Sequence, residues 1–74
     1  MRKIISVRRN RNDTQMWYVV HDSVQKLYEV WHVDSRDPTI CRPDKLFVSY
    51  ASLPDDRTVR LLAMSRARDL ADAS

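Results

Sequence analysis

Glycine is absent from this chain of 74 residues, and cysteine occurs only once, at Cys41. Without glycine, the sequence has neither the glycine-rich loop that holds nucleotide phosphates nor the dinucleotide-binding fingerprint. A lone cysteine excludes an internal disulfide and any zinc site built from several cysteines, which favours a reducing compartment. Turns that need a positive φ must use Asn or Asp instead of glycine. The candidates for these positions are Asn10, Asn12, Asp13 and Asp22.

Long apolar runs are also missing. No run approaches the roughly 18 residues of a membrane span, and the start of the chain, MRKIISVRRNRN, has basic residues without the apolar core of a signal peptide. We therefore expect a cytoplasmic protein that neither crosses nor binds a membrane.

The length and composition are those of one small globular domain, residues 1–74. Apolar residues make up 43% of the chain and charged residues 31%, a balance typical of a folded protein. A core of this size leaves a net stability of only a few kcal/mol, so a partner can contribute to it.

Residues 1–34 have the β-branched and aromatic composition of strands. The pattern predicts strands at Lys3–Arg9, Met16–His21 and Lys26–Asp34, joined by polar turns at Asn10–Asp13 and Asp22–Gln25. Short connections between neighbouring strands predict a three-stranded antiparallel meander.

Side chains alternate between the two faces of such a sheet. Two four-residue loops would pair Val7 with Met16 and Tyr18 with Glu29. The Tyr18 face, which we expect to form the core, then holds Ile5, Val7, Met16, Tyr18, Val20, Leu27, Glu29, Trp31 and Val33. The opposite Trp17 face holds Ile4, Ser6, Arg8, Trp17, Val19, His21, Lys26, Tyr28, Val30 and His32. A slip of one residue would exchange the faces.

The rest of the chain predicts a connection and a helix. Two prolines favour an irregular connection over 35–51, in which Leu46–Tyr50 forms either a short fourth strand or a helical turn. Ser52 and Asp55 have the spacing of a capping box and begin a helix over 52–72. Its apolar stripe, expected to pack on the Tyr18 face, consists of Val59, Leu62, Ala63, Ala67 and Leu70. The expected fold class is α+β, with a three- or four-stranded antiparallel meander packed on one C-terminal helix.

No constellation of residues indicates catalysis or metal binding. His21 and His32 lack a third ligand at a suitable spacing, and Ser23 is in no nucleophile-elbow motif. We expect no enzyme activity, no metal and no cofactor.

The charge pattern and the Trp17 face point instead to a binding function. Residues 1–12 carry five basic side chains and no acidic one, which suits an acidic partner, either nucleic acid or a protein surface. The Trp17 face stays exposed unless the 35–51 segment covers it. Trp, Tyr and Arg are the usual anchors of interfaces. The predicted partner-binding residues are Arg8, Arg9, Arg11, Trp17, His21, Lys26 and Tyr28.

The stretch WYVVHDSVQKLYEVWHV, followed by the helix from Ser52, resembles the AP2-like and arm-binding DNA-binding domains of phage integrases. That resemblance implies a three-stranded sheet that enters the major groove of DNA.

As a whole, the chain resembles the small host-takeover proteins of lytic phages in its size, its arginine-rich start, its lack of glycine and its lone cysteine. This second resemblance implies a regulator that binds a host protein complex, RNA polymerase in particular, and alters initiation and termination of transcription. The oligomeric state stays open.

Overall fold

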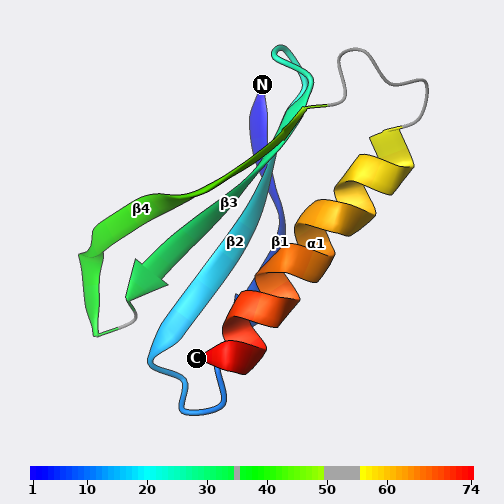
Figure 1. Cartoon of the computed structure of the whole chain (residues 1–74). Coiled ribbons are helices and arrows are strands. Elements are labelled where there is room, and N and C mark those ends of the chain that lie inside the picture. Colours follow the sequence, from blue (N-terminus) through cyan, green and yellow to red (C-terminus); the bar gives the residue numbers. More distant parts are fainter. Residues whose placement is uncertain (35, 50–55) are drawn as a thin grey trace.

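The computed structural model describes residues 1–34, 36–49 and 56–74. Its sheet is antiparallel with the strand order β1-β2-β3-β4, and a C-terminal helix packs along one face of the sheet (Figure 1). The elements are β1 (Arg2–Arg9), β2 (Gln15–Asp22), β3 (Leu27–Asp34), β4 (Asp37–Ser49) and α1 (Asp56–Ala73). The predicted α+β fold, a three-stranded meander with a C-terminal helix, is confirmed.

Strand β4 is the main departure from the expected elements. It runs for 13 residues through most of the segment predicted to be a connection, and it pairs with β3. Pro38 and Pro43 are compatible with it because β4 lies at an edge of the described sheet, where a missing N–H need not break a ladder. Tyr50 and the predicted helix cap at Ser52 and Asp55 lie outside the described residues.

The β1–β2 and β2–β3 hairpins are built without glycine. In the first, the buried Asn10 accepts hydrogen bonds at its Oδ1 from the N–H groups of Thr14 (2.8 Å) and Gln15 (3.0 Å). Asp13 takes the positive φ that this turn needs, at 58°, as one of the predicted candidates. The second turn uses Lys26, at φ 56°, which was not among them.

Helix α1 packs on the Trp17 face, so the prediction that it covers the Tyr18 face is wrong. The sheet contributes large side chains to this core and the helix contributes mostly small ones. The cluster consists of Trp17, Val19, Tyr28, Val30, Val59, Ala63, Ala67 and Ala71. Alanines at successive turns let the helix approach the sheet closely enough to bury two aromatic rings beneath it.

The register explains why the faces themselves were grouped correctly in β2 and β3. Tyr18 pairs with Trp31 rather than with Glu29, a shift of two residues that leaves each side chain on its face. In β1, a bulge between Ile4 and Ser6 breaks the alternation. Ile4 therefore pairs with Val20 and joins the Tyr18 face, whereas Ile5 packs against the core.

Candidate functional site

With the helix on the Trp17 face, the Tyr18 face has no helix over it in the described structure. Towards β1 it exposes apolar side chains: Ile4 is 55% exposed, Val7 is about half exposed, and the rings of Tyr18 and Trp31 are half-buried. Val20, between them, is buried without cover from the helix. Among the side chains that the structure describes, the exposed apolar ones of this face come from β1, β2 and β3.

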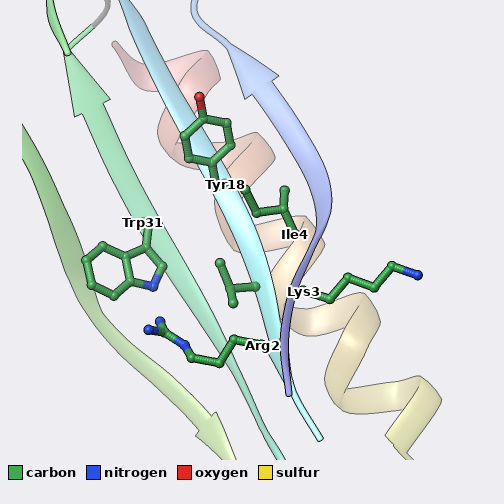
Figure 2. A pocket seen from close by; sticks show the side chains of 6 residues that line it. Arg2, Lys3, Ile4, Tyr18 and Trp31 are labelled. Atoms are coloured by element: carbon green, nitrogen blue, oxygen red, sulfur yellow. The ribbon is translucent and has the colours of Figure 1, made fainter.

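These side chains surround a shallow pocket of about 360 Å³. Figure 2 shows the Trp31 and Tyr18 rings on one side of it and Ile4 on the other, while the Lys3 side chain extends away from the rings. The pocket is lined by Arg2, Lys3, Ile4, Tyr18, Val20 and Trp31.

A polar cluster fixes the orientation of Trp31. Its indole Nε1–H donates a hydrogen bond of 2.7 Å to Glu29 Oε2, and the Arg2 guanidinium forms an ion pair with the same oxygen. The guanidinium also lies 5.3 Å from the centroid of the Trp31 ring, within the range of a cation–π contact. The Arg2 charge is thus compensated by a carboxylate that is 11% exposed, and the ring is held in place beside the pocket.

Two of the predicted anchors are not available to a partner. Trp17 is 6% exposed and Tyr28 is 2% exposed, because both lie under α1. The prediction that they lie on an exposed face is therefore wrong, and they belong to the core. His32 stacks on Trp17 with ring centroids 4.9 Å apart, and His21 stacks on Tyr28 at 4.6 Å. His21 is half-buried at the margin of this core.

The predicted basic residues are exposed but fall into two groups. Arg8, Arg9 and Arg11 lie at the β1–β2 hairpin, where Arg9 pairs with Asp13 at 3.2 Å. Lys26 is in the β2–β3 turn, at the other end of strand β2. An eight-residue strand separates the two turns by about 26 Å, so these four residues do not form one site.

The pKa shifts in the structure belong to turns. Hydrogen bonds from the side chain and the backbone N–H of Arg36 lower the pKa of Asp34 to about 2, at the turn between β3 and β4. The backbone N–H groups of Gln25 and Val24 lower the pKa of Asp22 in the turn before β3. Both carboxylates stabilise turns by accepting hydrogen bonds.

Within residues 1–34, 36–49 and 56–74, no three His, Cys, Asp or Glu side chains are grouped so that they could hold a metal ion. In the same part of the chain, no helix has the length and apolar character of a membrane span. The Tyr18 face is an apolar and aromatic surface on which Glu29 compensates the charge of Arg2, and a surface of this kind suits binding.

Comparisons with protein-family models, with curated proteins and with solved structures give no match. The case for a function therefore depends on the surface chemistry of the fold.

Proposed function

We propose that this protein is a non-enzymatic regulator that binds a host protein complex through its Tyr18 face, with bacterial RNA polymerase as the expected partner. The observation that supports this is the exposure of Ile4 and Val7 beside the Tyr18 and Trp31 rings. Contiguous apolar patches of this kind commonly mark protein interfaces, and tryptophan and tyrosine are their frequent anchors.

The charge on this face favours a protein over a nucleic acid. Two cations line the pocket: Arg2 pairs with Glu29 and contacts the Trp31 ring, and the Lys3 side chain extends away from the rings (Figure 2). A surface that binds nucleic acid needs free cations directed at phosphates, together with exposed rings on which bases stack. The exposed apolar side chains of Ile4 and Val7 are better matched by the apolar surface of a protein than by nucleic acid.

Basic residues on the edge strand β1 and in the hairpin after it complement this proposal. Lys3, Arg8 and Arg11 are exposed there. Lys3 pairs with His21 and Arg8 with Trp17, so both lie on the helix side of the strand, at the margin of the Tyr18 face. Charges at the margin of an interface mainly steer association and contribute less to its final affinity. These basic residues are complementary to an acidic region of the partner that borders its apolar contact surface. The resemblance to host-takeover proteins suggests RNA polymerase, and the site of action would then be the host cytoplasm.

Direct DNA binding is the second candidate, because Arg8, Arg9 and Arg11 are exposed close together in sequence at one hairpin. The helix on one face and the uncovered sheet on the other also agree with the arrangement that the AP2-like resemblance implies. Three arginine contacts to phosphates would give a slope of about −2.7 for log affinity against log salt concentration.

One titration experiment separates the two candidates. Fluorescently labelled protein is titrated with purified, nuclease-treated bacterial RNA polymerase and, separately, with duplex DNA at several salt concentrations. We expect saturable binding to the polymerase and a changed yield of full-length and terminated transcripts in reactions with the purified enzyme. Failure to bind the polymerase would refute the proposal. Tight DNA binding with the steep salt dependence would favour the second candidate.

A further inference from the structure

A second surface lies on the other side of the sheet, where the edge strand β1 meets helix α1. It is a groove with a pocket of about 340 Å³, lined by Arg8, Leu61, Met64, Ser65 and Arg68. Four of these residues come from the helix and lie on one side of it, because Leu61 is three and four residues before Met64 and Ser65, and Arg68 is four and three residues after them. They form a stripe beside the core stripe. We call this surface the β1–α1 groove.

The helix provides an apolar wall for this groove. Leu61 is 59% exposed, and Met64 is half-buried and packs against the core cluster. An exposed leucine beside a methionine gives an adaptable apolar surface, because the methionine side chain is unbranched and flexible. A pocket near the lower end of the roughly 300–1,000 Å³ range of ligand sites suits a single large side chain of a partner.

Two arginines flank the apolar wall from opposite elements. Arg8 comes from β1 and Arg68 from α1. The Arg68 guanidinium makes contacts within its own helix: it donates a long hydrogen bond of 3.4 Å to Ser65 Oγ and lies 3.9 Å from Asp69 Oδ1. No acidic side chain is among the residues that line the pocket. Two guanidinium groups on either side of an apolar surface are complementary to carboxylates on either side of an apolar side chain.

The backbone of β1 adds a third feature. Because β1 is the first strand in the order β1-β2-β3-β4, its outer edge faces no further strand of the described sheet. An extended peptide can add to such an edge through main-chain hydrogen bonds, while its side chains reach neighbouring pockets. Beyond the bulge at Ile5, the segment from Ser6 to Arg9 pairs regularly with β2 and presents this edge beside the groove.

We propose that the β1–α1 groove binds an extended acidic peptide segment of a partner protein. One large apolar side chain of the peptide enters the pocket against Leu61 and Met64, and carboxylates on either side of it pair with Arg8 and Arg68. This site is separate from the Tyr18 face and does not depend on the identity of the partner proposed above.

The test is a titration of the ¹⁵N-labelled full chain with a capped synthetic peptide that has one leucine between runs of glutamate. We expect saturable shifts of backbone signals from residues 6–9 and 61–68. A peptide with serine in place of the leucine should bind at least about tenfold more weakly, because the apolar contact is lost. Equal affinity of the two peptides would overturn the proposal, and so would shifts centred on Tyr18 and Trp31.

Matched arginine variants make the test specific. Arg8→Ala and Arg68→Ala should each weaken binding of the leucine peptide by about tenfold, whereas Arg66→Ala should change it less than about twofold. Arg66 is exposed on the same helix and outside the pocket lining, so it loses the same charge without touching the groove. Equal losses in all three variants would reveal attraction by net charge alone and would overturn the proposed site. Displacement of the peptide by duplex DNA at equal concentration would identify nucleic acid as the occupant and would also overturn it.

Discussion

The pair of variants Trp17→Ala and Trp31→Ala tests which face of the sheet the helix covers. The Trp17 ring is 6% exposed and packs under α1, with the His32 ring stacked on it. Truncating a buried tryptophan to alanine typically costs about 3–5 kcal/mol. The total free energy of unfolding of a domain this small is of the same order, only a few kcal/mol, so Trp17→Ala removes a large part of it or all of it.

Trp31→Ala should be much milder. This ring is half-buried on the Tyr18 face, and its specific contacts are the hydrogen bond to Glu29 and the Arg2 guanidinium beside it. Losing one hydrogen bond and one cation–π contact costs about 2 kcal/mol together. The ion pair between Arg2 and Glu29 stays in place, so no buried charge is left without a partner.

Urea unfolding followed by far-ultraviolet circular dichroism is the suitable assay, since removing a tryptophan alters the fluorescence signal itself. With a slope of about 1 kcal/mol per molar urea, Trp17→Ala should lower the midpoint by about 3–5 M or unfold the protein without urea. Trp31→Ala should lower it by about 2 M at most. A larger loss for Trp31→Ala than for Trp17→Ala would refute the placement of the helix on the Trp17 face.

The other predictions concern turns and packing. Lys26→Gly should raise the free energy of unfolding by about 0.5–1 kcal/mol in urea unfolding, because glycine removes the cost of a positive φ. Lys26→Ala is the control, since alanine keeps that cost. Equal stability of the two variants would contradict this explanation. Ala67→Leu should lower the free energy of unfolding by about 1–3 kcal/mol, because Ala67 is fully buried and a larger side chain has no room between helix and sheet. An unchanged urea midpoint would show that the helix packs loosely on the sheet. Arg36 lowers the pKa of Asp34 from its usual 3.8 to about 2, so the carboxylate stabilises the folded state above the unfolded pKa and this contribution is lost as the pH falls from about 4 to about 2. As the pH is lowered across this range, the melting temperature should therefore fall more steeply for the native chain than for Asp34→Asn. Parallel curves of melting temperature against pH would argue against stabilisation by the Asp34–Arg36 pair.

Local patterns in the sequence predicted the strands and the helix well. The β-branched runs of residues 1–34 and the apolar spacing from Val59 onwards each depend on neighbours close in sequence, and the structure has elements there. Strand β4 was mostly missed because Pro38 and Pro43 argue against a strand, and only its position at the edge of the sheet makes them compatible.

The choice of face could not be predicted by the same means. Both faces of the meander carry large apolar side chains, so alternation alone does not say which one the helix covers. The available signal was in the helix, whose buried positions Ala63, Ala67 and Ala71 are small and suit a face that carries bulky rings. Trp17 and Tyr28 were consequently assigned to the surface, while Tyr18 and Trp31 of the candidate site were assigned to the core. The bulge that moves Ile4 to the Tyr18 face has no signal in the sequence, since no glycine or proline marks it.

Whether the Tyr18 face binds the partner can be tested by measuring the affinities of Ile4→Glu and Leu62→Glu for purified bacterial RNA polymerase. Ile4 is 55% exposed on that face and Leu62 is 57% exposed on the helix, so both variants place the same new charge at equally accessible positions. Circular dichroism first establishes that both variants fold. We expect Ile4→Glu to weaken binding at least about tenfold, because a carboxylate would be buried against apolar surface, and Leu62→Glu to change it less than about twofold. Equal affinities of the two variants, or a loss confined to Leu62→Glu, would contradict the account.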